Sequence, residues 1–316
     1  MNPFEEINLT GIKTYSAKQR ASKVQTSAEA VPPKAGMTVK TFLEGLPSIL
    51  KANDLKAIAK AVVLARKKGK PIIAMIGGHV IKAGCSPILI DLVKKGLITH
   101  VASNGSAAIH DTELARFGHT SEDVASQLDD GSFGMAADTA ELVNQAAKTA
   151  AATKTGFGWS VGAALLKENA PYADRALIAC CFRQKIPYTL HVAIGTDIVH
   201  QHPGADGAAI GEASLRDFRI FAATVARLGD GGVVLNFGSA VIMPEIFLKA
   251  LSIARNLQNN IQDFTTANFD MIQHYRPSVN VVTRPVLKGG KGYAITGHHE
   301  IMIPLLSAAI LEESAL

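Results

Sequence analysis

The spacing of hydrophobic and polar residues predicts that helices and strands alternate along the chain from residue 38 onward. Residues 38–66 carry apolar side chains at helical spacing, so we expect a helix there. The uninterrupted apolar run at 71–76 is typical of a strand buried on both faces of a parallel sheet. A second strand is predicted at 98–102. Further strands are predicted at 187–195 and 232–237, with short candidates at 279–284 and 292–296, and further helices at 86–95, 109–117, within 135–184, and at 214–228, 244–256 and 300–311.

This alternation indicates an α/β fold: a doubly wound, mostly parallel sheet with helices on both faces, of the Rossmann-like kind. No repeat or linker divides residues 37–316, which predicts a single domain there. Residues 1–36 show no sustained period and contain Pro32-Pro33. We expect them to form an N-terminal arm, either flexible or ordered by another subunit.

Composition narrows the class of protein. Of the 316 residues, 47% are hydrophobic and 19% are charged, which excludes a disordered chain. The net charge of +5 is not concentrated in a basic stripe and only 6% of residues are aromatic, so no nucleic-acid partner is expected. Charged residues interrupt every long apolar run, and Met1 to Glu6 lack a signal-peptide core. We therefore expect a cytoplasmic protein with no membrane partner.

Cysteine usage points to buried, structural positions. Three cysteines do not make a disulfide framework. Cys180 and Cys181 lie in an apolar helical segment and are expected in the core. Cys85 stands at a helix start, where the helix dipole would lower a thiol pKa, but no obvious partner accompanies it. We assign it a structural role.

Glycine and small polar residues follow four of the predicted strands and give a candidate nucleotide site. Any one such turn would be an ordinary connection. All four at the carboxyl edge of one sheet favour a nucleotide, because glycines let phosphate approach the backbone and helix N-termini attract anions. Neither GxGxxG nor GxxxxGK[ST] occurs. The candidate cofactor-binding residues are Gly77, Gly78, Ser103, Asn104, Gly105, Asp206, Gly238 and Ser239.

A pair of histidines leaves a metal site open as an alternative. His200 and His202 alternate on one segment, so both could chelate a metal together with Asp206. Ordinary loop polarity explains the same residues, and neither HExxH nor CxxC anchors a site. We predict no metal, and keep a metal-dependent hydrolase as the alternative function.

Six segments form a collinear set: 78–84, 89–101, 103–111, 205–212, 234–241 and 303–306. In their order and spacing these segments resemble deoxyhypusine synthase. The similarity covers roughly residues 40–310 and rests on this collinear order. What it implies is a deoxyhypusine synthase-like fold, NAD at the edge of the sheet, and homotetramers with sites shared between paired subunits. The family oxidises a polyamine, spermidine, and transfers its butylamine unit through a lysine imine.

The chain departs from this family where the transfer chemistry lies. Residues 281–285, Val-Val-Thr-Arg-Pro, replace the stretch that carries the catalytic lysine. Lys288 and Lys291 are nearby in a glycine-rich setting that does not match, so Lys291 is an outside candidate for the nucleophile. The acidic pair that ends the second turn becomes Ile109-His110. We therefore predict a divergent relative that is not a true deoxyhypusine synthase.

Residues 104–115 are also similar to a segment of ornithine cyclodeaminase-like (LOR/SDH-type) proteins, which bind NAD and act on amino acids. There a turn of small residues leads into a His-Asp pair, here His110 and Asp111, which suit a base and its orienting group. The hypothesis is an NAD-dependent oxidoreductase or transferase acting on an amine or amino acid. A non-catalytic nucleotide-binding homologue is a further alternative. The candidate catalytic residues are His110, Asp111, Glu212, His298, Glu300 and Lys291.

Overall fold

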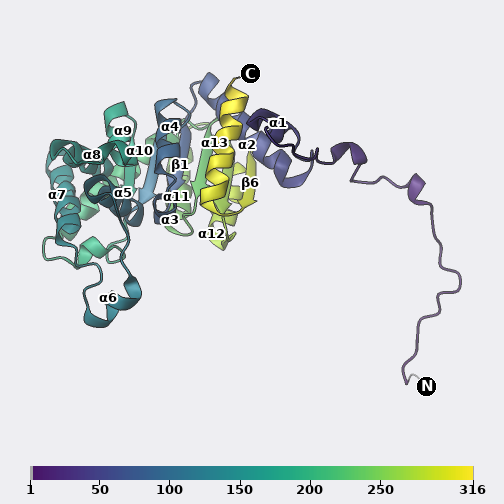
Figure 1. Cartoon of the computed structure of the whole chain (residues 1–316), viewed down its shortest axis with the longest axis horizontal. Helices are drawn as coiled ribbons and strands as arrows, with labels where there is room; N and C mark the ends of the chain where they lie inside the picture. Colours follow the sequence, from purple (N-terminus) through teal and green to yellow (C-terminus); the bar gives the residue numbers. More distant parts are fainter. Residues whose placement is uncertain (1–2, 316) are drawn as a thin grey trace.

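A computed structural model describes residues 3–315 and contains a six-stranded sheet in which every paired strand is parallel (Figure 1). The spatial order is β3-β2-β1-β4-β5-β6. The chain thus winds outward from β1 to β3 and returns to place β4 beside β1, which confirms the doubly wound architecture. The strands are β1 (Ile72–Ile76), β2 (His100–Asn104), β3 (Tyr188–His191), β4 (Val233–Phe237), β5 (Thr265–Asp270) and β6 (Lys291–Thr296).

Helices cover both faces of the sheet because successive strand residues point in opposite directions. Ile72, Ala74 and Ile76 of β1 join a core with α2, α4, α5 and α13, whereas Ile73 and Met75 join a second core with α10 and α11. The helices are α1 (Val39–Glu44), α2 (Leu50–Lys67), α3 (Gly78–Lys82), α4 (Ser86–Lys94), α5 (Gly105–Phe117), α6 (Val124–Asp130), α7 (Ala137–Thr153), α8 (Phe157–Lys167), α9 (Leu177–Gln184), α10 (Gly207–Val225), α11 (Ile242–Asn256), α12 (Tyr275–Pro277) and α13 (His299–Ser314).

Short helical turns complete the chain. η5 is a π-helix and the others are 3-10 helices. They are η1 (Ala17–Gln19), η2 (Thr26–Ala28), η3 (Ala173–Arg175), η4 (Ile198–Gln201), η5 (Ser278–Thr283) and η6 (Arg284–Val286).

The predicted strand at 279–284 is wrong, because these residues lie in η5 and at the start of η6, and the strand beside β4 is β5 instead. Apolar patterning does not reveal β5, since its sequence is Thr-Thr-Ala-Asn-Phe-Asp. Its polar side chains are hydrogen-bonded inside the protein: Thr266 donates to the Val281 carbonyl, and Asn268 accepts from the Asn236 amide at 2.7 Å. Hydrogen bonds make burial of these groups tolerable.

Several predicted bounds also change. The single helix expected over 38–66 is two helices, and the break contains Pro47, which disfavours a helical conformation at the residue before it. The strand expected over 187–195 ends at His191, and the helix expected from residue 214 begins at Gly207. Among the described residues, no helix is both long and apolar enough to cross a membrane.

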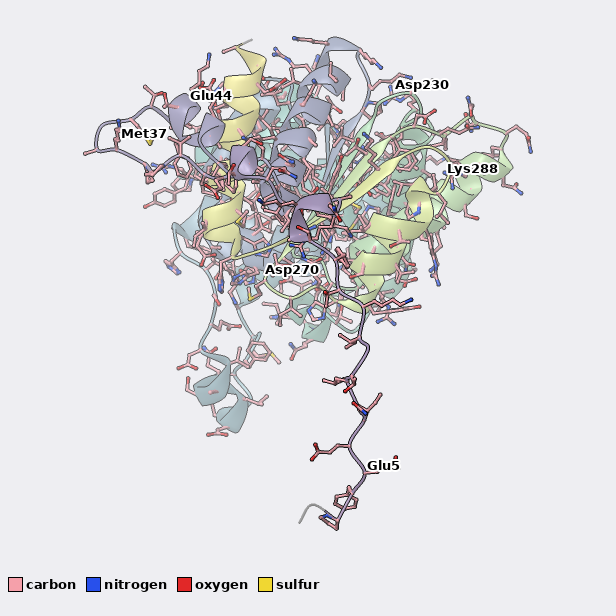
Figure 2. The ribbon with its side chains drawn as sticks, turned by 90° about the vertical axis from the view of Figure 1, so that its right-hand side faces the viewer. Glu5, Met37, Glu44, Asp230, Asp270 and Lys288 are labelled. Carbon is pink, nitrogen blue, oxygen red and sulfur yellow. The ribbon has the colours of Figure 1, made fainter. Side chains whose placement is uncertain are left out.

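The N-terminal segment extends away from the body, as Figures 1 and 2 show, with Glu5 near its far end. Every residue from 3 to 27 is exposed. The backbone first meets the body where Val31 N–H donates to the Gly45 carbonyl and Ser48 N–H donates to the Ala28 carbonyl. The division into an arm and one domain remains a prediction.

The three cysteines are buried and free, as expected from their sequence context. At Cys85 burial dominates over any helix dipole and raises the pKa of the thiol to about 11. A thiol protonated at neutral pH is a poor nucleophile, which fits a structural role.

Candidate functional site

The turns after β1 and β4 meet at the point where the strand order reverses. Gly77 N–H donates to the Phe237 carbonyl at 3.0 Å, and a side chain on Gly77 would collide with the Gly238 carbonyl. Gly238 has a left-handed φ of +64°, which favours glycine. In open α/β sheets this crevice is where ligands bind. The structure therefore brings Gly77, Gly78, Gly238 and Ser239 together.

α11 follows the β4 turn directly and points its N-terminus toward this crevice. Its first turn is held by the Ser239 hydroxyl, which accepts from Met243 N–H at 3.2 Å, while Asn236 donates to the Ser239 carbonyl at 3.0 Å. Its N-cap residue, Val241, provides no side-chain hydrogen bond. A helix N-terminus beside two glycine turns suits a phosphate group.

Two histidines close the other side of the crevice. The rings of His79, on α3, and His299, on α13, have centroids 5.6 Å apart. His299 is buried, its Nε2 donates to the Phe269 carbonyl at 3.1 Å, and burial lowers its pKa. A side chain on Gly238 would overlap the His299 ring. From the sequence we selected the neighbouring His298 and missed His299.

The N-terminus of α5 is already occupied by oxygen atoms of the protein. The Asn104 side chain accepts from Ala107 N–H at 3.1 Å, and the Asp197 carboxylate lies where a side chain on Gly105 would stand. Burial raises the pKa of Asp197 to about 6. Ser103 is buried, and its hydroxyl donates to the Asn104 carbonyl. A phosphate would meet a carboxylate here, so this helix start suits an anion less well than α11.

Beside α5 lies an acidic cavity of about 240 Å³, which we call the α5 cavity. It adjoins the glycine turn, because a side chain on Gly78 would collide with Ser106 and contact the His110 ring. Three carboxylates and one lysine face it. Its polar and charged lining residues are Lys82, Ser106, His110, Glu113, Ser121, Glu122, Thr196 and Asp197.

His110 and Glu113 form a hydrogen-bonded unit through Thr120. The Thr120 hydroxyl donates to Glu113, so its oxygen must accept from His110 Nδ1, which lies 2.8 Å away from it. Because the proton of the His110 ring is then on Nδ1, Nε2 carries a lone pair and can accept a hydrogen bond. Thr139 also donates to Glu113. Although burial acts to raise it, hydrogen bonds from His110, Thr120 and Thr139 hold the pKa of Glu113 below its ordinary value. The i,i+3 spacing of His110 and Glu113 on a helix was the available sequence signal.

Asp111 faces away from this cavity. It is fully buried, and its two oxygens accept from Leu177 N–H at 3.0 Å and Ile178 N–H at 2.8 Å, at the start of α9. Burial raises its pKa to about 6. Asp111 thus anchors α9 to α5, and Glu113, through Thr120, takes the orienting position beside His110.

Four other candidates lie apart from the glycine turns or on their periphery. Asp206 is exposed and caps α10, accepting from Ala208 N–H and Ala209 N–H. Glu212 pairs with Arg216 within α10. His298 and Glu300 are exposed at the start of α13, where they contact each other at 3.9 Å.

Lys291 lies at the amino ends of the strands, whereas the crevice lies at their carboxyl ends. It begins β6, which runs parallel to its neighbours, so the carboxyl end of that strand is Thr296. Five strand residues at ~3.3 Å each separate the two edges by ~16 Å. Lys288, three residues earlier, lies well away from Asp270, which ends β5 (Figure 2). The structure does not bring Lys291 to the crevice.

The alternative metal ligands are engaged elsewhere. His200 Nδ1 accepts from Gly195 N–H and Asp197 N–H, and His202 Nε2 donates to the Gly134 carbonyl at 2.8 Å. Within residues 3–315, no group of three or more His, Cys, Asp or Glu side chains is placed to hold a metal.

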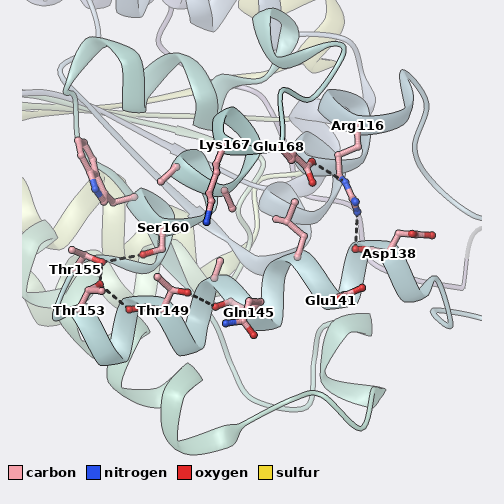
Figure 3. Close-up of a pocket in the computed structure, with 15 residues that line it drawn as sticks. Arg116, Asp138, Glu141, Gln145, Thr149, Thr153, Thr155, Ser160, Lys167 and Glu168 are labelled. Carbon is pink, nitrogen blue, oxygen red and sulfur yellow. Dashed lines mark hydrogen bonds and ion pairs between the residues drawn. The ribbon is translucent and has the colours of Figure 1, made fainter.

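A larger groove of about 790 Å³ lies between α7 and α8 (Figure 3). Some of its polar side chains are paired with one another: Arg116 with Glu168, and Thr153 with Thr155, which bonds Ser160. No turn from the carboxyl edge lines it. We therefore place the candidate site at the crevice and the α5 cavity.

Comparison with known proteins identifies the fold. No protein-family model and no curated protein sequence matches the chain. A candidate deoxyhypusine synthase from Entamoeba histolytica superposes with a TM-score of 0.52 and 11% identity, covering 89% of this chain and 96% of that one. A candidate LOR/SDH protein from Methanococcus maripaludis S2 gives 0.51 and 17%, covering 89% and 73%. The deoxyhypusine synthase-like fold expected from the sequence is confirmed.

A third similar structure was determined with ligands. The ternary complex of AgrE with ornithine and NAD+ gives a TM-score of 0.52 and 14% identity over 83% of this chain. The present chain spans about a third of AgrE, 33% of its length. At these identities the likeness establishes the shared fold.

Proposed function

We propose that the protein is an NAD-dependent enzyme that oxidises a small amine or amino acid at the carboxyl edge of its sheet. One observation carries the proposal: the glycine turns after β1 and β4 touch at the switch point, beside the N-terminus of α11 and the acidic α5 cavity. The ligands in the AgrE complex, ornithine and NAD+, are of the two classes that these features suit.

The pyrophosphate of the cofactor is assigned to the crevice. Gly77 and Gly238 let the two turns pack against each other at the switch point, and Ser239 and Ala240 lead into α11, whose N-terminus suits an anion. When bound, NAD supplies the hydride acceptor.

The amine is assigned to the α5 cavity. Glu113 is ionised at neutral pH and Glu122 and Asp197 face the same space, so a cationic ammonium group is attracted there. His110 Nε2 is the free acceptor of the unit and receives a proton from the ammonium group, because an amine must lose that proton before its C–H bond can give up a hydride. Thr120 and Glu113 hold the His110 ring in that tautomer.

Transfer through a lysine imine is not part of this proposal, because Lys291 lies at the opposite edge of the sheet. A simple oxidation to an imine, followed by hydrolysis, uses only the groups at the crevice and the cavity.

The test is thermal unfolding with NAD, NADH and NADP. A ligand at 100 times its Kd stabilises by about 2.7 kcal/mol, a shift of a few degrees at this size. Ala240→Asp adds a carboxylate at the start of α11 and should abolish the shift, whereas the matched uncharged variant Ala240→Asn should keep it. Absence of any shift in the wild-type protein overturns the proposal.

Turnover is measured by NADH formation with a panel of amines and amino acids. His110→Gln should abolish turnover while the NAD-induced shift persists. Unchanged turnover in this variant would remove His110 from the chemistry.

A further inference from the structure

A second cavity flanks the crevice on the opposite face of the sheet. This space of about 410 Å³, which we call the α10–α11 cleft, lies between the first halves of those helices, at the end of β3. Its walls are mainly apolar, and the rim carries Glu245 paired with Lys249. The residues that line it include His191, Val192, Leu215, Phe218, Glu245 and Ile246.

A buried chain of hydrogen bonds ends at this cleft. It starts at Thr224, whose Oγ1 lies 2.8 Å from His100 Nδ1. His100 Nε2 lies 3.0 Å from Thr189 Oγ1, which lies 3.0 Å from His191 Nε2. Phe221 packs edge-on against both imidazole rings, which holds them in place.

We assign the protons of this chain from its Thr224 end. The Thr224 hydroxyl points to the Ile220 carbonyl at 3.5 Å, so it accepts from His100 Nδ1–H. His100 Nε2 then accepts from the Thr189 hydroxyl, which in turn accepts from His191 Nε2–H. His191 is therefore left with a lone pair on Nδ1.

That lone pair has no hydrogen-bond partner in the part of the chain that the structure describes. His191 is only 1% exposed and lines the cleft. Burial lowers the pKa of His191, and likewise of His100, to about 3, so both rings are neutral at physiological pH. A buried acceptor without a donor destabilises the folded protein, and a ligand N–H would recover that loss.

We propose that the α10–α11 cleft binds a neutral, flat heterocycle that presents an amino or N–H donor to His191 Nδ1, namely the adenine ring of the cofactor. Val192, Leu215, Phe218 and Ile246 supply the apolar surface for such a ring. The cleft is reached from the crevice along α11, because Glu245 and Ile246 lie in its first turns, just beyond Ser239. This inference rests on the proposed function, since it assigns the adenine half of the same cofactor.

The first experiment observes His191 in the wild-type protein. Ring-¹⁵N histidine NMR reports the tautomer and the hydrogen bonding of each imidazole nitrogen. We expect an Nε2–H tautomer for His191, and a shift of its Nδ1 resonance when adenosine or AMP is added. Nicotinamide mononucleotide, which lacks the adenine, should leave that resonance unmoved.

The second experiment measures affinity by calorimetry. His191→Phe keeps the ring volume and removes the acceptor, and should weaken AMP and NAD about tenfold, with nicotinamide mononucleotide unchanged. Thr189→Val breaks the chain one step away, frees the tautomer and should weaken AMP less. His119→Phe, at an exposed residue stacked on Phe117, is the matched control and should change nothing.

The outcomes separate the two proposals. If NAD binds but adenosine leaves His191 unshifted and His191→Phe binds AMP normally, the adenine site is overturned and the proposed function stands. If adenosine shifts His191 but NAD does not bind, the cleft is supported and the NAD-dependent function fails. If no nucleotide binds, both are overturned.

Discussion

The two cavities beside the carboxyl edge use the same pair of residue types for opposite purposes. In the α5 cavity His110 is hydrogen-bonded to Thr120, which is hydrogen-bonded to the ionised Glu113. In the α10–α11 cleft His191 is hydrogen-bonded to Thr189, which is hydrogen-bonded to a second, neutral histidine, His100. The group at the end of the threonine therefore decides whether the histidine belongs to a charged unit or to a neutral acceptor. One face of the sheet suits a cation, and the other an uncharged ring.

The largest effect expected from any single change on either face is at Asp111, which separates the binding face of α5 from its anchoring face. Asp111→Ala leaves two buried N–H groups at the start of α9 without an acceptor. We expect the free energy of unfolding to fall by ~3 kcal/mol, as measured by urea denaturation. Amine affinity of the folded protein should be retained. A loss of affinity with unchanged stability would instead return Asp111 to the cavity.

The stability of the protein at acid pH tests whether His191, in the α10–α11 cleft, is neutral. The unfolded state protonates a histidine near pH 6.5, whereas His191 remains neutral in the folded state down to about pH 3. Between these values the unfolded state binds more protons, so stability falls as pH falls. Relative to His191→Phe, the wild-type protein should lose ~2 kcal/mol between pH 7 and pH 5. Equal losses in urea titrations of both proteins would contradict a buried, neutral His191.

The charge of the α5 cavity is tested by Glu113→Gln, which keeps the shape of the side chain. We expect the KM for the amine to rise about tenfold, a change of ~1.4 kcal/mol, with the Kd for NAD unchanged. His191→Phe should show the reverse pattern. If either variant weakened the amine and NAD equally, the assignment of the amine to one face of the sheet and of the adenine to the other would be wrong.

The smallest effect is expected at Lys291, which belongs to neither cavity. Lys291→Ala should change stability by less than ~0.5 kcal/mol and leave turnover unchanged. Loss of turnover in this variant, with NAD binding intact, would bring a lysine imine back into the mechanism.

The sequence revealed the fold well because buried parallel strands are continuous apolar runs. β1 has this form and β4 is interrupted only by Asn236, and the glycines that follow them mark the switch point. Collinear motifs added the deoxyhypusine synthase-like fold. β5 escaped because its burial is made tolerable by side-chain hydrogen bonds, whose partners are chosen by the tertiary structure.

The candidate site was only partly predictable for the same reason. His110 and the turn glycines stand in local motifs. Asp197, by contrast, reaches Gly105 from a loop more than ninety positions later, and the pairing of His100 with His191 requires two strands to lie side by side. Sequence spacing does not contain these contacts. The adjacency of His110 and Asp111 was misleading in itself, because neighbouring residues on a helix point in different directions.

The polar character of β5 has a consequence for how the sheet assembles. Asn236 donates to Asn268, Asn268 donates to Gln273, and Gln273 donates to the Ile295 carbonyl, so one line of amides crosses three adjacent strands. An all-apolar strand can slide by two residues and still bury its side chains. In this sheet the same slide would leave several buried amide groups without hydrogen-bond partners. The residues that hide β5 from pattern analysis thus make misaligned sheets costly, and select one alignment of the β4, β5 and β6 half during folding.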